Sequence, residues 1–131
     1  MAYTYLGIFY VAVPISLLNL AVFSVDAVYH YEILIGCLLI LWASDSGAYF
    51  AGTRFGKTKL FERVSPKKSW EGFLGGAFAA ILVAFVLSQY FVVLEDWKWL
   101  VIAGIIIIAG TYGDLIESLF KRSIAIKDSG S

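Results

Sequence analysis

Three acidic residues interrupt stretches of the sequence that are otherwise apolar: Asp45, Asp114 and Glu117. A carboxylate inside a hydrophobic segment is costly and usually faces a polar cavity or serves a function. Asp114, Glu117, Ser118 and Lys121 recur at i, i+3, i+4 and i+7, which places them on one side of a helix. Carboxylates that share a polar cavity are natural ligands for Mg²⁺, a hard cation that prefers oxygen.

A simpler interpretation exists for part of this pattern. Glu117 and Lys121 could form only an ordinary i, i+4 ion pair near the membrane interface. That interpretation is weaker for Asp45 and Asp114, because no basic residue lies within a helical turn of either. Both interpretations of Glu117 stay open from the sequence.

A basic stretch over about residues 53–71 is the second feature with chemical potential. Its six cations are Arg54, Lys57, Lys59, Arg63, Lys67 and Lys68. Such a stretch beside a membrane attracts anions, although cytosolic loops are basic in any case. Ser65 is a good helix N-cap, and Pro66 is favoured at the first helical position. We therefore expect a helix to begin there, with its positive end and the nearby lysines directed at an anion.

The composition indicates what kind of fold positions these residues. Of the 131 residues, 60% are hydrophobic and only 15% are charged, whereas about a quarter of a typical soluble domain is charged. The ten basic and ten acidic residues exclude a generally basic nucleic-acid binder, and the single cysteine excludes an internal disulfide. We expect an all-α, polytopic integral membrane protein that forms a single transmembrane domain over residues 1–131.

Four stretches of about 20 residues with few or no charges predict about four transmembrane helices. The predicted spans are Tyr3–Phe23, Ile33–Gly52, Gly72–Leu94 and Trp99–Phe120. In the second span, Gly47 and Ala51 form a small-residue pair that suits close helix packing.

The basic residues predict the orientation of the spans. Nine of the ten fall in the 53–71 stretch or after Phe120, and the positive-inside rule makes that side cytosolic. The second and fourth spans both run toward this side, so the three acids lie near the cytosolic face. Trp97 and Trp99 suit the outer aromatic belt, and Trp70 suits the inner one.

At these positions the sequence resembles the phosphatidate cytidylyltransferases, also called CDP-diacylglycerol synthases. The resemblance rests on three segments in matching order and spacing: Asp45-Ser46-Gly47-Ala48-Tyr49, then Ser65-Pro66-Lys67-Lys68-Ser69-Trp70-Glu71-Gly72, then Gly113-Asp114-Leu115-Ile116-Glu117-Ser118 running into Lys121-Arg122 and Lys127-Asp128-Ser129-Gly130. The first segment is weak alone, whereas the second and third are specific. Ser46 and Ser69 stand where threonine is frequent, and both substitutions keep a hydroxyl.

The resemblance implies an enzyme that joins CTP and phosphatidate to give CDP-diacylglycerol and pyrophosphate. It implies a divalent cation, usually Mg²⁺, as cofactor. The implied partners are CTP, phosphatidate and membrane lipid, with no nucleic acid, and a homodimer stays open. The implied location is a bacterial inner membrane, with the active site facing the cytosol.

The resemblance also implies roles for individual residues. Asp114, with Asp45 or Glu117, would hold the Mg²⁺. The implied catalytic residues are Asp114, Lys121, Arg122, Lys127 and Asp128. The implied substrate-binding residues are Asp45, Ser65, Lys67, Lys68, Ser69 and Ser118. The cations among them would bind phosphates and stabilise the charge that develops on pyrophosphate.

In the family, the last motif continues into His-Gly-Gly and then Asp-Arg-x-x-Asp, which the present sequence does not reach. We therefore expect the chain to be a fragment of a larger cytidylyltransferase domain. Three other functions stay open: a CTP-dependent lipid or polyprenol kinase, a small transporter subunit whose buried acids suit an ion path, and a module kept only by helix association.

Overall fold

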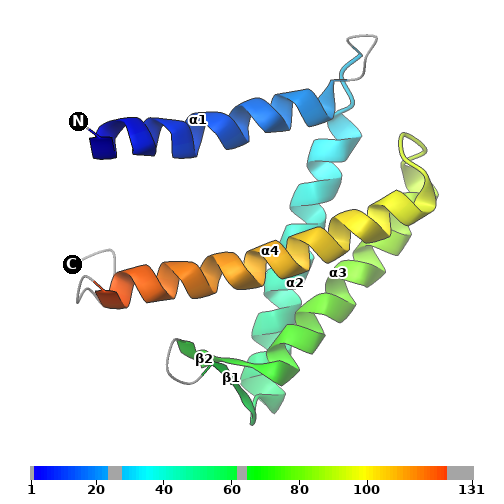
Figure 1. Ribbon diagram of the computed structural model, residues 1–131. Helices are drawn as coiled ribbons and strands as arrows, with labels where there is room; N and C mark the ends of the chain where they lie inside the picture. The colour runs from blue at the N-terminus through cyan, green and yellow to red at the C-terminus, as the bar shows by residue number, and fades with distance from the viewer. Residues whose placement is uncertain (1, 24–27, 62–64, 124–131) are drawn as a thin grey trace. The chain divides into compact units, whose positions relative to one another are not determined.

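The described part of the chain forms four helices and one two-stranded hairpin. The computed structural model describes residues 2–23, 28–61 and 65–123. In chain order the elements are α1 (Ala2–Val22), α2 (Tyr31–Phe55), β1 (Lys59–Phe61), β2 (Ser65–Ser69), α3 (Trp70–Tyr90) and α4 (Asp96–Ser123) (Figure 1). The expected all-α class with four helices is confirmed. The hairpin between α2 and α3 is an element that the sequence analysis did not predict.

Three of the helices are long and apolar enough to cross a membrane. They are α2, α3 and the part of α4 over Asp96–Lys121. In α1, the apolar stretch within the described residues is Gly7–Leu20, which is shorter than a typical span. The helical membrane-protein class is therefore confirmed, whereas a membrane crossing by α1 stays a prediction.

The chain divides into two compact units, Met1–Gly36 and Cys37–Ser131. In the first unit, Phe23 follows α1 and forms an antiparallel bridge with Tyr29, and the two rings lie 5.3 Å apart between centroids. Every residue of the candidate site described below belongs to the second unit.

In the second unit, α2 and α3 approach each other through small residues. A Cβ atom on Gly47 would lie 2.7 Å from the carbonyl oxygen of Gly75, and one on Gly76 would lie 2.7 Å from that of Ser44. A Cβ atom on Gly75 would collide with that of Ala51. Because these distances leave no room for larger side chains, the two backbones are in direct contact. The expected packing role of Gly47 and Ala51 is confirmed.

The core of the second unit lies mainly between α3 and α4. Its buried members are Ile40, Ala80, Ala84, Leu87, Trp99, Ala103 and Ile107. Trp99 is fully buried, and its indole N–H donates to the carbonyl oxygen of Phe91 at 3.3 Å. Trp99 therefore packs inside the protein, where the alanines of this core leave room for an indole ring, and its place in an outer aromatic belt stays a prediction. Trp97, two positions earlier, is exposed.

Candidate functional site

The basic stretch folds into a hairpin that leads directly into α3. β1 and β2 are antiparallel, with Lys59 opposite Ser69 and Phe61 opposite Ser65. The prediction that a helix begins at Ser65 and Pro66 is therefore wrong. Residues Ser65–Ser69 pair with β1 instead, which satisfies backbone groups that a helix would otherwise use.

The N-cap of α3 is Ser69 rather than Ser65. The Ser69 backbone is extended, with φ −123° and ψ 156°, and its side-chain oxygen accepts a hydrogen bond from the Gly72 N–H at 3.1 Å. Ser69 is also buried, at 5% exposure. Its hydroxyl therefore caps the N-terminus of α3. This structural role comes in addition to the substrate-binding role that the resemblance implies.

Glu71 joins the hairpin to the first turn of α3. Its two carboxylate oxygens accept hydrogen bonds from the Thr58 N–H at 3.0 and 3.2 Å. In the opposite direction, the Trp70 N–H donates to the carbonyl oxygen of Thr58 at 2.9 Å. These bonds fix the base of the hairpin against the helix, and with it the direction of Lys68 on β2.

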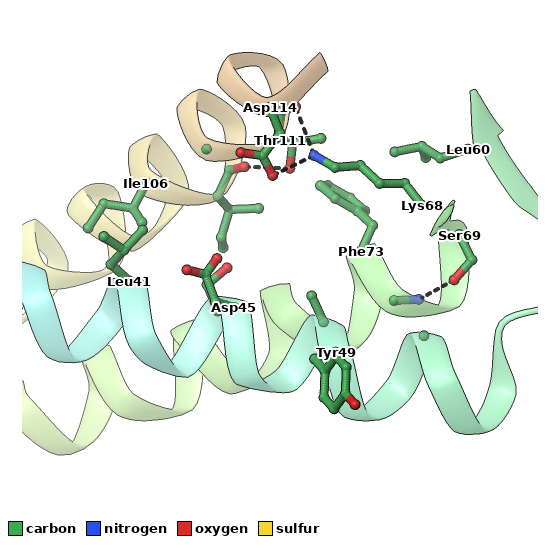
Figure 2. Close-up of a pocket in the computed structure, with 16 residues that line it drawn as sticks. Leu41, Asp45, Tyr49, Leu60, Lys68, Ser69, Phe73, Ile106, Thr111 and Asp114 are labelled. Atoms are coloured by element: carbon green, nitrogen blue, oxygen red, sulfur yellow. Dashed lines mark hydrogen bonds and ion pairs between the residues drawn. The ribbon is translucent and has the colours of Figure 1, made fainter. Parts of the chain in front are cut away.

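A polar cavity of about 230 Å³ lies between α2, the hairpin, α3 and α4. Its polar and charged lining residues are Ser44, Asp45, Tyr49, Lys68, Ser69, Thr111 and Asp114. Figure 2 shows Asp45 pointing from α2 toward α4, where Asp114 and Thr111 lie. The fold thus brings Asp45, Lys68 and Asp114 from three sequence motifs to one cavity. We call it the polar cavity below.

Lys68 and Asp114 form the shortest polar contact between residues that line this cavity. The Lys68 Nζ lies 2.7 Å from Asp114 Oδ2 and also donates to the carbonyl oxygen of Thr111 at 3.4 Å. The Lys68 side chain is 26% exposed and that of Asp114 is 63% exposed. No basic residue lies within a helical turn of Asp114 on its own helix, and the hairpin supplies one, Lys68.

Glu117 lies outside the lining of the polar cavity. Its Oε1 is 2.6 Å from the Nζ of Lys121, in an i, i+4 ion pair. The simpler of the two interpretations of Glu117 therefore describes its contact in this structure. Among the described residues, no group of three or more Asp, Glu, His or Cys side chains is close enough to hold a metal ion.

The donor atoms in the polar cavity nevertheless suit Mg²⁺. Two carboxylates, Asp45 and Asp114, line it together with the hydroxyl-bearing residues Ser44 and Thr111. Proteins usually bind Mg²⁺ through one or two carboxylates, and water and substrate phosphates complete its coordination. Asp45 and Asp114 are the residues that would hold the ion here.

The other residues of the implied site are placed as follows. Ser65 lies on β2 and Ser118 on α4, and neither lines the polar cavity. Lys67 belongs to β2 and Arg122 to α4, but their side chains are outside the described part of the structure. Lys127 and Asp128 lie outside the described residues.

Three polar residues of the cavity are not among the predicted site residues: Ser44, Tyr49 and Thr111. Thr111 precedes Asp114 by three positions, so both face the same side of α4. Ser44 is the neighbour of Asp45. A search for hydrogen-bonding residues three or four positions from each acid of an apolar stretch would have found Thr111 and Tyr49.

Comparison with known proteins shows the family of this chain. The model of the cytidylyltransferase family matches residues 1–131. A phosphatidate cytidylyltransferase of Haemophilus influenzae is 39% identical over 120 residues, which cover 86% of this chain and 41% of that protein. One from Staphylococcus epidermidis is 40% identical over 123 residues, covering 87% of this chain and 47% of the relative.

A third relative is the phosphatidate cytidylyltransferase of Staphylococcus aureus strain COL. It is 41% identical to this chain over 103 residues, and the match covers 38% of the length of that protein. The chain thus spans less than half the length of these curated relatives. No solved structure matches it significantly.

Proposed function

The chain belongs to the cytidylyltransferase family, and from that premise we propose that it takes part in the transfer of CMP from CTP to phosphatidate. The products are CDP-diacylglycerol, a lipid, and pyrophosphate. The observation that carries the proposal is the polar cavity, in which Asp45, Lys68 and Asp114 meet between three helices. The two specific segments of the resemblance supply Lys68 and Asp114, and the weaker segment, Asp45-Ser46-Gly47-Ala48-Tyr49, supplies Asp45.

Charge is the main obstacle to this reaction, because both substrates are anions. The phosphate of the lipid must approach the α-phosphorus of CTP, and pyrophosphate must leave with additional negative charge. Lys68 places one cation on the polar cavity. When bound, Mg²⁺ would neutralise phosphate charge and orient the reacting oxygens. Asp45 and Asp114 would hold the ion.

Lys68 has a further task in this proposal. Its ammonium group pairs with Asp114 at 2.7 Å. A phosphate oxygen is an equally strong acceptor for a charge-assisted hydrogen bond. Lys68 would therefore change partner when a phosphate enters the polar cavity, and Asp114 would then be available to the metal ion.

The location of the polar cavity supports a site at the membrane surface. It lies at the end of α2 and α3 that the hairpin joins, against the middle of α4, and each of these three helices is apolar enough to span a bilayer. The basic residues of the 53–71 stretch favour the cytosol for that end. A soluble nucleotide and a membrane lipid would both reach such a site. We propose the bacterial inner membrane, because the relatives compared above are bacterial proteins.

The alternatives are not favoured by these observations. The family match and all three relatives name a cytidylyltransferase rather than a kinase or a transporter. The reaction products still separate a transferase from a kinase. The transferase puts cytidine into the lipid and releases pyrophosphate, whereas a kinase transfers only the γ-phosphoryl group and releases CDP.

The test is a transfer assay in membranes with CTP labelled in its cytidine group, phosphatidate and Mg²⁺. It is run on this chain and on a chimera in which the chain replaces the matching 120 residues of the Haemophilus relative. We expect label in the lipid phase and pyrophosphate in the aqueous phase. If both proteins insert and neither labels the lipid, or if CDP is the nucleotide product, the proposal is wrong.

A further inference from the structure

A second cavity, of about 320 Å³, lies against the polar cavity and has a different character. Its walls are Leu60 and Phe61 of β1, Trp70 and Phe73 of α3, and Ile108 and Leu115 of α4. The rings of Trp70 and Phe73 meet edge to face, with centroids 5.9 Å apart. We call this space the apolar cavity.

The two cavities share part of their walls. Leu60, Phe73 and Thr111 line both of them. Figure 2 shows the Lys68 side chain reaching toward Asp114 and Thr111, with Leu60 and Phe73 drawn beside its stem. The aliphatic part of a lysine can cover apolar surface while its ammonium group remains in a polar site. An apolar surface and a phosphate-binding cation are therefore adjacent.

The apolar cavity offers few polar groups to an occupant. The hydroxyl of Thr111, one of its two polar side chains, already donates to the carbonyl oxygen of Ile107 at 2.8 Å. The other, Tyr112, is largely exposed. The volume of the apolar cavity is near the lower end of the range for small-molecule sites. It therefore suits a hydrocarbon segment better than a sugar, a base or a second phosphate.

We propose that the apolar cavity binds the first part of one acyl chain of the phosphate-bearing lipid whose headgroup occupies the polar cavity. This inference rests on the proposed function, since it assigns the lipid substrate to that site. We assign the apolar cavity to the substrate lipid rather than to bulk lipid, because the wall that it shares with the polar cavity places it next to Lys68. A bulk membrane lipid without an exposed phosphate monoester would lack that second contact.

The test uses the fluorescence of Trp70, which lines the apolar cavity. The protein is placed in phosphatidylcholine vesicles that contain either phosphatidate or phosphatidylcholine with bromine on the acyl carbons near the glycerol. Bromine quenches a tryptophan only at close range. The contribution of Trp70 is isolated by comparison with Trp70→Phe, because the sequence contains four tryptophans. No CTP is added, so the measurement does not depend on the transfer reaction.

We expect brominated phosphatidate to quench Trp70 more strongly than brominated phosphatidylcholine at the same mole fraction. Lys68→Met should remove this preference, because it removes the headgroup contact. Equal quenching by the two lipids would mean that the cavity takes bulk lipid, and absence of quenching would mean that no acyl chain enters. Either result overturns the inference.

A matched pair of variants tests the cavity itself. Ile108 and Ile105 lie one turn apart on α4 and are similarly exposed, at 58% and 61%, but only Ile108 lines the apolar cavity. We expect Ile108→Phe to raise the phosphatidate concentration that gives half of the maximal quenching by about tenfold. The larger side chain would exclude roughly two methylene groups of the acyl chain from the apolar cavity. Ile105→Phe should leave it unchanged. Equal effects of the two variants would contradict the proposal.

The two proposals can fail separately. If Trp70 shows the phosphatidate preference and the transfer assay gives no labelled lipid, the acyl site stands and the proposed reaction is wrong. If transfer occurs without any preference in quenching, the reaction stands and the acyl chain binds elsewhere.

Discussion

The Nζ atom of Lys68 on β2 lies 2.7 Å from Oδ2 of Asp114 on α4, so one ion pair joins residues 46 positions apart. With Asp114 63% exposed, such a pair contributes at most about 1 kcal/mol to the free energy of unfolding. The pair is therefore too weak to account for the packing of α4. Its consequence is local, because it holds a cation and a carboxylate together on the polar cavity.

The first prediction separates these two effects of Lys68. We expect Lys68→Met to lower kcat/KM for transfer by about 10- to 150-fold, the loss of a charge-assisted hydrogen bond to phosphate of roughly 1.5–3 kcal/mol. The free energy of unfolding should change by less than about 1 kcal/mol. Both are measured in parallel in the chimera described above.

Lys98→Met is the matched control. Lys98 also belongs to α4 and also forms an ion pair, with Glu95 at 3.1 Å, but it lies away from the polar cavity. Its substitution should leave transfer unchanged. A similar loss of activity in both variants would show that charge in general, rather than the position of Lys68, matters.

The second prediction concerns the metal ion and uses Mn²⁺ as a spectroscopic substitute for Mg²⁺. We expect Asp45→Asn and Asp114→Asn each to weaken Mn²⁺ binding at least about tenfold. Lys68→Met should strengthen Mn²⁺ binding in the absence of nucleotide, because Asp114 loses a competing cation. Binding is followed by the paramagnetic resonance of the free ion.

Asp96→Asn controls for the removal of one negative charge from the same helix, since Asp96 lies in the first turn of α4. Glu117→Gln should shift Mn²⁺ binding less than Asp114→Asn, because Glu117 pairs with Lys121 outside the polar cavity. A larger effect of Glu117→Gln would instead assign the ion to Glu117.

The third prediction tests where α3 begins. Ser69→Ala removes the hydroxyl that accepts the Gly72 N–H, and we expect it to cost about 1 kcal/mol of the free energy of unfolding. Ser69→Thr should retain most of the stability, because it keeps the hydroxyl. Ser65→Ala should stay within about 0.5 kcal/mol of the original chain. A larger loss for Ser65→Ala than for Ser69→Ala would move the start of the helix back to Ser65.

The fourth prediction concerns the contact between α2 and α3. A Cβ atom on Gly47 would lie 2.7 Å from the Gly75 carbonyl oxygen, which is backbone and cannot rotate away. We expect Gly47→Ala to cost about 1–3 kcal/mol, the usual penalty for overpacking. Gly104→Ala is the matched control, since an added Cβ there meets nothing within 4 Å. Thermal unfolding of both variants in the same detergent gives the comparison.

Much of the fold could be predicted because long apolar stretches without charges have few alternatives in a membrane. The boundaries were harder to predict. The third span was expected to reach Leu94, but α3 ends at Tyr90 and Phe91 has an extended backbone. Residues 91–94 are as apolar as the helix, so hydropathy contains no signal for that end.

The hairpin and the ion pair could not be predicted, because both depend on contacts between distant residues. Pro66 favours Ser65 as the N-cap in the local sequence, and only the pairing of β2 with β1 moves the start of the helix to Ser69. Asp114 likewise has no nearby cation in the sequence, and Lys68 reaches it only after the hairpin has formed. The motifs indicated which residues belong to the site, whereas the contacts of these residues could be identified only from the folded structure.

The direct backbone contact between α2 and α3 has a mechanical consequence for the polar cavity. Asp45 lies on α2 two positions before Gly47, and the Gly47–Gly75 contact leaves no space for these two helices to approach each other more closely. Asp114 lies on α4, whose Gly110 and Gly113 touch nothing that an added Cβ would meet within 4 Å. Around the site, α2 and α3 thus present Asp45 from a closely packed pair of backbones, whereas α4 has room for larger residues at Gly110 and Gly113, on either side of Thr111 and next to Asp114.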